Sequence, residues 1–209
     1  ERLSPHTVLV AGGGVAGMQA ALGLAALDVP VLLVERNAHL GGQVMRLDKV
    51  YPTDHCAFCP TWSMARACYE APGVNVLLHA EFVGLSTDGE RTLAQIRVRR
   101  PAVDPALCLF CGACVEACGK KALQRRDPGM TWDPALPPVM RIDASLCDGC
   151  GACARACPVQ AVNLDSEPVT LSLPVEDVIY ATGFTEPAAG DAAWAGEFGS
   201  HTHPDIFTA

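Results

Sequence analysis

The chain has 209 residues, of which 50% are apolar, and this is enough to bury the core of one domain or of two small ones. Its formal net charge is −8 and its isoelectric point is near 5.1, so it has no cationic excess with which to neutralise phosphates. We therefore do not expect nucleic acid or an anionic membrane surface as a partner, and the composition favours small cofactors and other proteins.

The apolar stretch of residues 15–34 contains Gln19, Asp28 and Pro30, which favours a helix followed by a buried strand over a membrane span. The polar first residues show no secretory signal peptide. Eight of the 11 cysteines fall in two tight, equally spaced groups, which is a metal pattern rather than an extracellular disulfide framework. These features predict a cytoplasmic protein with no membrane span.

The first elements form a predicted βαβ unit. Residues 7–11 are β-branched and apolar, a glycine cluster and an Ala/Leu-rich helix to about Leu27 follow, and residues 29–36 predict a second strand. A helix is expected over 61–71. Short strands are expected over 74–86 and 92–100, antiparallel and joined through an Asp-Gly turn.

From Pro101 to Asp165 the composition changes to Cys, Gly, Ala and Pro, with few strand formers. This stretch contains a repeat: residues 104–123 align with 143–162, with ten of twenty positions identical. The Pro-rich linker between the two copies should be irregular, and strand character returns over 167–184. We therefore expect the first part of a nucleotide-binding domain over 1–100, an inserted module over 101–165, and a truncated continuation of that domain over 166–209.

Gly12-x-Gly14-x-x-Gly17 follows a strand and opens a helix, the context in which this motif binds a dinucleotide. The glycines permit a tight turn, approach of the pyrophosphate and close helix–strand packing, and the helix N-terminus stabilises the anion. Glu35 ends the second strand, where a carboxylate can accept hydrogen bonds from both ribose hydroxyls and disfavours a 2′-phosphate.

The segments "HLGGQ" and "VIYATGF" decide between FAD and NAD. A Gly-Gly pair after the ribose acid and an Ala-Thr-Gly turn near the end resemble the FAD domain of the thioredoxin-reductase type. The resemblance implies FAD and an α/β, Rossmann-like domain. The predicted FAD-binding residues are Gly12, Gly14, Gly17, Glu35, Arg36, Gly41, Gly42, Gln43, Thr182 and Gly183.

The two cysteine groups share the spacing C-x2-C-x2-C-x3-C, in which three thiolates bind one cubane and the fourth binds the other. Two 4Fe-4S clusters in an α+β ferredoxin module are therefore expected. Two zinc sites are the alternative, although zinc modules usually separate their cysteine pairs by a longer spacer. The predicted ligands are Cys108, Cys111, Cys114 and Cys157 for one cluster, and Cys147, Cys150, Cys153 and Cys118 for its twin.

Three cysteines remain outside the repeat. Cys56 and Cys59 form a C-x2-C pair, and Cys68 follows nine residues later in a predicted helix. The pair could ligate a further cluster completed from elsewhere, act as a redox dithiol, or be structural. Lys49 could approach a flavin ring or be a solvated surface lysine.

Taken in order, "AGGGVAGMQAAL", "LGGQVMRLDKVYPTDHCAFCP", a two-cluster ferredoxin insert and "VIYATGF" resemble the A-type subunit of heterodisulfide reductase. The resemblance implies a FAD-dependent iron–sulfur oxidoreductase subunit that passes electrons among protein partners, with flavin-based bifurcation in that family. Expected partners are heterodisulfide reductase-type, hydrogenase or formate dehydrogenase subunits and ferredoxin. No catalytic side chain is assigned, because the cofactors carry the chemistry.

Two other functions stay open from the sequence. One is an NAD(P)H-dependent disulfide reductase that uses Cys56 and Cys59, although it leaves the ferredoxin insert without a clear role. The other is a non-catalytic electron-transfer polypeptide that binds clusters but no flavin.

Overall fold

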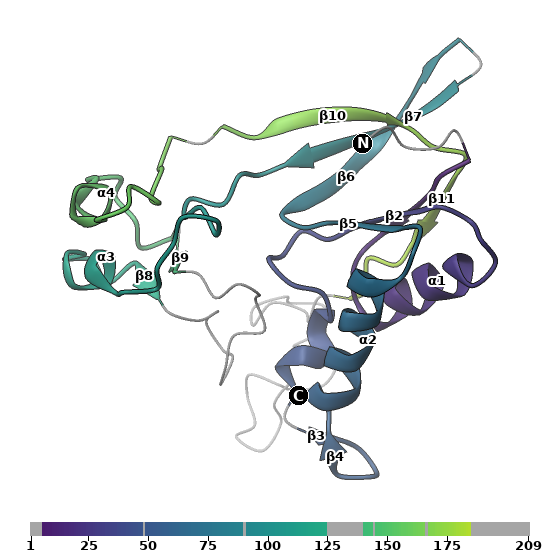
Figure 1. Cartoon of the computed structure of the whole chain (residues 1–209), viewed down its shortest axis with the longest axis horizontal. Coiled ribbons are helices and arrows are strands. Elements are labelled where there is room, and N and C mark those ends of the chain that lie inside the picture. The colour runs from purple at the N-terminus through teal and green to yellow at the C-terminus, as the bar shows by residue number, and fades with distance from the viewer. Residues whose placement is uncertain are drawn as a thin grey trace, which may run out of the picture.

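The computed structural model describes residues 6–47, 49–89, 91–124, 140–143, 145–165 and 167–184. Its centre is a parallel sheet with the strand order β11-β1-β2-β5 (Figure 1). The strands are β1 (Val8–Ala11), β2 (Val31–Val34), β5 (Val74–Leu77) and β11 (Asp177–Tyr180). The predicted βαβ unit is present, and residues far along the chain add β11 beside β1 in parallel register. The predicted α/β class is thereby confirmed.

A second, antiparallel sheet lies over the first, with the order β10-β7-β6. Its strands are β6 (Ala80–Asp88), β7 (Arg91–Val98) and β10 (Val169–Pro174). The β6–β7 turn includes Gly89 at φ 61°, as the Asp-Gly signal predicted. The expected strand over 74–86 divides in two, because His79 at φ 53° turns the chain from one sheet into the other.

The two central strands of the parallel sheet, β1 and β2, are buried throughout. Alternate side chains along each strand point to opposite faces of the sheet. Leu9 and Leu32 pack toward the antiparallel sheet, against Ala94 and Ile96. Their neighbours in the strands pack toward the helices on the other face, in a cluster of Val10, Met18, Ala21, Val31, Leu33, Leu40, Ala65 and Cys68. The result is a layer of helices, a parallel sheet and an antiparallel sheet, as Figure 1 shows.

The helical layer consists of α1 (Val15–Ala25), which follows β1, and α2 (Phe58–Glu70), with a short 3-10 turn, η1 (Gly42–Arg46). Helix α2 begins three residues before the predicted start. Pro60 lies in its first turn, where the missing amide hydrogen would have no partner within the helix. A small hairpin of β3 (Lys49–Val50) and β4 (His55–Cys56) precedes it.

Between β7 and β10 the chain leaves the antiparallel sheet and returns to it. This stretch forms α3 (Ala113–Glu116), β8 (Leu123–Gln124), β9 (Arg141–Ile142) and α4 (Ala152–Ala156), set apart from the two sheets in Figure 1. It has an apolar cluster of its own around Val103, Met140 and Val162. Most of the expected irregular linker lies outside the described residues, as does the predicted third segment beyond Phe184.

Across the described ranges, none of the helices combines the length and the apolar character that crossing a bilayer would need.

Candidate flavin and iron-sulfur sites

Three glycine-bearing segments meet at the carboxyl ends of β1 and β2. The Gly12 amide donates to the carbonyl of Val34 at 2.8 Å, and the Gly41 amide donates to the carbonyl of Gly13 at 2.7 Å. The Ala181 amide donates to the carbonyl of Ala11 at 2.8 Å. The first glycine motif, the Gly-Gly pair and the Ala-Thr-Gly turn are therefore joined by backbone hydrogen bonds, although they are far apart in sequence.

Side chains are excluded at two of these glycines by backbone atoms. A Cβ on Gly12 would strike the carbonyl of Ala181, and a Cβ on Gly17 would strike the carbonyl of Gly12. Gly12 also has φ 113°, a conformation that residues with a Cβ rarely adopt. The turn and the close packing of α1 on β1 thus both require glycine.

The N-terminus of α1 faces solvent. Gly14 is its N-cap and offers no side chain to the free amides of the first turn, and Val15 and Ala16 are exposed. An open helix N-terminus beside backbone that lacks Cβ atoms fits a pyrophosphate. These residues therefore fit the diphosphate of FAD.

Glu35 is buried beneath the glycine motif, with 5% of its surface exposed. Its Oε2 accepts a hydrogen bond from the Gly13 amide at 2.7 Å, and its Oε1 accepts one from the Asn37 amide at 2.8 Å and one from Asn37 Nδ2 at 2.7 Å. Its own backbone is held by Leu77 and Ala80. The carboxylate is thus fixed next to the glycine motif, at the place expected for a ribose.

Two residues of this site were not predicted from the sequence. Gly13 is the unassigned middle position of the motif, yet its amide binds Glu35 and a Cβ there would press on Leu40 and Glu35. Asn37 supplies two of the three donors to Glu35. The run of three glycines was a signal for Gly13, whereas no pattern pointed to Asn37.

The other predicted FAD residues lie at the edge of this site. Gly42 is close to Gly14, since a Cβ on Gly42 would come within 3.0 Å of the Gly14 Cα. Gln43 is half-buried in η1, and Thr182 and Gly183 are exposed beside Ala181. Arg36 is exposed, and its charge makes a small contribution to the lowered pKa of Glu81, of which the hydrogen bond from Arg97 is the main cause.

The two cysteine repeats are related by an internal two-fold arrangement. The Asp104 amide donates to the carbonyl of Ala161 at 2.8 Å, and the matched Asp143 amide donates to the carbonyl of Ala122 at the same distance. The bridge between Val103 and Val162 is matched by the pairing of Ile142 with Leu123 in β9 and β8. Each repeat therefore pairs its ends with those of the other copy.

Four of the cysteines line one pocket in this module, which we call site A: Cys108, Cys111, Cys114 and Cys157. The pocket encloses about 290 Å³, including the part open to solvent, and its other walls include Phe110, Met140 and Pro158. Burial raises the pKa of Cys114, and the charges of Cys108 and Cys157 raise it further. Cys157, from the second repeat, thus lies with the cysteines of the first.

The matched group, site B, consists of Cys118, Cys147, Cys150 and Cys153. Burial raises the pKa of Cys153, and the charges of Cys147 and Cys118 add to this shift. The exchange of the fourth cysteine is therefore reciprocal. Within the described part of the chain, no three Cys, His, Asp or Glu residues converge closely enough to hold a single metal ion.

The fourth cysteine of each group receives a backbone hydrogen bond. The Ala122 amide donates to Cys118 Sγ at 3.3 Å, and the Ala161 amide donates to Cys157 Sγ at 3.2 Å. The hydrogen bond from the Ala122 amide is the main cause that lowers the pKa of Cys118. Burial opposes this shift, and the backbone amides of Lys120, Leu123 and Lys121 add to it. Amides aimed at sulfur favour the thiolate, which is the form that binds iron. The donor set fits iron–sulfur clusters.

Cys56 ends β4 and Cys59 lies in the first turn of α2; both are exposed, and the Cys59 thiol is 3.5 Å from Cys56 Sγ. This hydrogen bond is the main cause that raises the pKa of Cys59, and the charge of Cys56 is the second. Cys68 is instead fully buried against α1, and burial raises its pKa to about 11. The structure thus separates Cys68 from the exposed pair.

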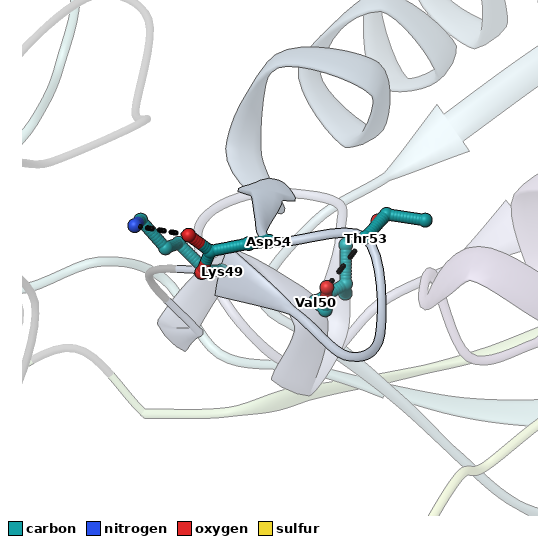
Figure 2. Close-up of polar contacts among 4 residues, drawn as sticks. All are labelled: Lys49, Val50, Thr53 and Asp54. Carbon is teal, nitrogen blue, oxygen red and sulfur yellow. Dashed lines mark hydrogen bonds and ion pairs between the residues drawn. The ribbon is translucent and has the colours of Figure 1, made fainter.

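Figure 2 shows two polar contacts in the β3–β4 hairpin, which ends at Cys56. Lys49 Nζ donates to Asp54 Oδ2 at 2.8 Å, and Thr53 Oγ1 donates to the carbonyl of Val50 at 3.3 Å. Lys49 is therefore an exposed residue in an ion pair across the hairpin.

Two family models match the chain. The model described as FAD dependent oxidoreductase matches residues 7–55, which contain the first glycine motif, Glu35 and the Gly-Gly pair. The model described as 4Fe-4S binding domain matches residues 101–124 and 140–163, which are the two cysteine repeats.

Among solved structures, the chain resembles thioredoxin reductase from Lactococcus lactis, with a TM-score of 0.38 and 14% identity over 96% of this chain and 82% of that one. It also resembles L-proline dehydrogenase from P. horikoshii, with a TM-score of 0.38 and 23% identity over 46% of this chain and 19% of that one.

Curated relatives match more closely in sequence. One of the iron-sulfur A-type subunits of CoB–CoM heterodisulfide reductase from Methanopyrus kandleri is 35% identical over 96% of this chain and 31% of the relative. The A-type subunit of the H(2)/formate:CoB-CoM heterodisulfide,ferredoxin reductase of Methanococcus maripaludis is 33% identical over 96% of this chain and 31% of the relative. The resemblance predicted from the motifs is confirmed: this chain, which spans about a third of the length of these relatives, is similar over nearly its whole length to heterodisulfide reductase A-type subunits.

Proposed function

We propose that the chain is an electron-transfer oxidoreductase subunit that binds one FAD and two 4Fe-4S clusters. The observation that carries this proposal is that Cys157 shares a pocket with Cys108, Cys111 and Cys114, and that Cys118 lies with Cys147 and Cys153 in the same reciprocal way. Such an exchange is the ligand pattern of two-cluster ferredoxins. Two independent zinc sites would not need it.

When bound, FAD exchanges electrons in pairs or singly and the clusters exchange them singly, and no side chain has to act as acid, base or nucleophile. The residues of this chain instead hold and position the groups. Gly12, Gly14, Gly17 and the Gly41–Gly42 pair present backbone to the diphosphate, and Glu35 accepts from the ribose. The remaining members of the proposed FAD set are Arg36, Gln43, Thr182 and Gly183.

The proposed division into 1–100, 101–165 and 166–209 gives the cysteine module a fixed place on the flavin domain. Val98, at the end of β7, is paired with Val169, at the start of β10, so both ends of the module leave from adjacent strands. The pKa of His79, which lies beside the nucleotide site, is lowered mainly by burial and second by the positive charge of Arg141 in the module. The two residues are therefore close to each other. Electrons could thus pass within one chain.

The partners are also a proposal. The names of the relatives describe subunits of CoB–CoM heterodisulfide reductases, some of them coupled to hydrogen, formate or ferredoxin. We accordingly propose other redox subunits of these types as partners, with ferredoxin as a further acceptor. Flavin-based bifurcation is part of the same proposal.

The test is anaerobic purification followed by analysis of flavin, iron and acid-labile sulfide. The proposal predicts about eight irons and eight sulfides with one FAD per chain, since each 4Fe-4S cluster carries four of each. Eight irons without flavin would instead identify a cluster-binding polypeptide, and zinc without sulfide would contradict both.

The exposed Cys56–Cys59 pair supports a second candidate, because its sulfurs are within 3.5 Å of each other. As a redox dithiol it would make the chain a disulfide reductase; as ligands the two cysteines would hold a further cluster. Cys56→Ser distinguishes the two. It removes dithiol chemistry and leaves eight irons in the first case, and it lowers an iron content above eight in the second.

A further inference from the structure

The two cysteine loops of the module have similar backbone conformations but different charges near them. Their loops share positive φ angles at matched positions, with Phe110 at 54° matching Gly149 at 72°, and Lys121 at 54° matching Gln160 at 53°. Backbone geometry therefore does not distinguish the sites. Any difference between them must come from the side chains and donors that differ between the repeats.

Only four of the twenty matched positions differ in charge. Leu109, Val159 and Gln160 of the site A segments are replaced around site B by Asp148, Lys120 and Lys121. Glu116 lies midway between the site A ligand Cys114 and the site B ligand Cys118, and Arg155 holds the matched position between Cys153 and Cys157. The contact of Arg155 with the carbonyl of Cys150 assigns its charge to site B. At the positions that differ in charge, three cations and one carboxylate thus accompany site B, whereas neutral residues stand at three of the matched positions around site A.

The cations are held close to the ligands of site B. Arg155 Nη1 donates to the carbonyl of Cys150 at 3.2 Å, which fixes the guanidinium over the loop that carries that ligand. Lys120 and Lys121 lie two and three residues after the ligand Cys118, and Lys120 is within electrostatic range of Asp148. The described walls of the pocket at site A, in contrast, carry no charged side chain.

The backbone hydrogen-bond donors also differ between the two sites, and site B again has the more positive environment. Cys157 of site A is followed by Pro158, which has no amide hydrogen, whereas Cys118 of site B is followed by Gly119, which has one. Hydrogen bonds to cluster sulfurs and nearby positive charge both stabilise the reduced form, because reduction adds a negative charge.

We propose that Arg155, Lys120 and Lys121 raise the reduction potential of the cluster at site B above that of the cluster at site A. The first electron to enter the module then rests at site B, and site A is reduced second. This inference deepens the proposed function and depends on it, since both clusters must be present.

The test is a redox titration of the anaerobically purified chain, followed by the EPR signals of the reduced clusters. Two separate one-electron midpoints are expected. Arg155→Gln and the double variant Lys120→Gln/Lys121→Gln should each lower the upper midpoint and leave the lower one in place. The three substitutions together should change the distribution of one electron between the sites at least tenfold, which is about 59 mV for a one-electron couple.

Two controls keep a structural effect apart from an electrostatic one. Arg155→Lys keeps the charge and should restore the upper midpoint. An increase in salt from about 0.1 M to about 1 M shortens the Debye length from about 10 Å to about 3 Å and should narrow the gap between the midpoints.

Three results would overturn the inference: a single shared midpoint, an upper midpoint that none of the cation variants moves, or a shift of the lower midpoint by Arg155→Gln. In each of these cases the iron and sulfide contents still stand at eight. A chain without iron and sulfide would instead contradict the proposed function itself.

Discussion

Glu35 is held by three hydrogen bonds from protein donors, and Glu35→Gln tests how much they contribute. The carboxylate offers one oxygen to the Gly13 amide and the other to both nitrogens of Asn37. A glutamine keeps one acceptor oxygen and turns an NH2 group toward the remaining donor. Hydrogen bonds to charged groups contribute about 1.5–3 kcal/mol, and a buried donor without a partner costs about 1–3 kcal/mol. We therefore expect Glu35→Gln to lower the free energy of unfolding by about 2–4 kcal/mol.

Urea unfolding of the flavin-free chain, followed by far-UV circular dichroism, measures this loss. With a slope of about 2 kcal/mol per M, the midpoint should fall by about 1–2 M. Asn37→Ala is the matched control, because it removes one donor and leaves both oxygens of Glu35 bonded; it should cost about 1 kcal/mol. An unfolding free energy for Glu35→Gln within about 0.5 kcal/mol of the unchanged chain would refute the reasoning, since that is the range of ordinary surface substitutions.

Three further predictions follow from the cysteines and the hairpin. Cys157→Ser should abolish the same EPR signal as Cys108→Ser, although the two residues belong to different repeats; loss of different signals would contradict the reciprocal ligation. Cys68, with its pKa raised to about 11 by burial, should resist iodoacetamide at pH 8, where roughly one part in a thousand is thiolate, and mass spectrometry should find it alkylated only at higher pH or after unfolding. Lys49→Ala should change the free energy of unfolding by less than about 0.5 kcal/mol, because its ion pair is exposed; a larger loss in urea unfolding would show that the hairpin depends on it.

The sequence predicted the parts of the fold that depend on local pattern. The β-branched run over 7–11, the glycine motif and the acid at Glu35 define one βαβ unit, and the structure contains it. The resemblance carried by the Ala-Thr-Gly turn assigned residues 177–180 to the nucleotide-binding domain, whereas their pairing with β1 was not predicted. Strong local signals of this kind survive because tertiary packing reinforces them.

What the sequence left out depends on contacts between distant segments. The change of sheet at His79 interrupts a run that looks like a continuous strand, and only the pairing of β6 with β7 reveals it. Strands β8 and β9 are two residues each and carry no periodic signal. Asn37 could not be recognised as a partner of Glu35, because side-chain hydrogen bonds in a loop follow no residue period.

The paired strands β7 and β10 are joined over six residue pairs before the cysteine module begins. The cysteine module is thus connected to the antiparallel sheet by two adjacent strands, as a loop is connected to a hairpin. Replacing the module should therefore leave the register of β7 and β10 unchanged. The module is in this sense an exchangeable insertion. It could be lengthened, replaced or shortened to a tight turn, in evolution or by protein engineering, without a change in the nucleotide-binding fold.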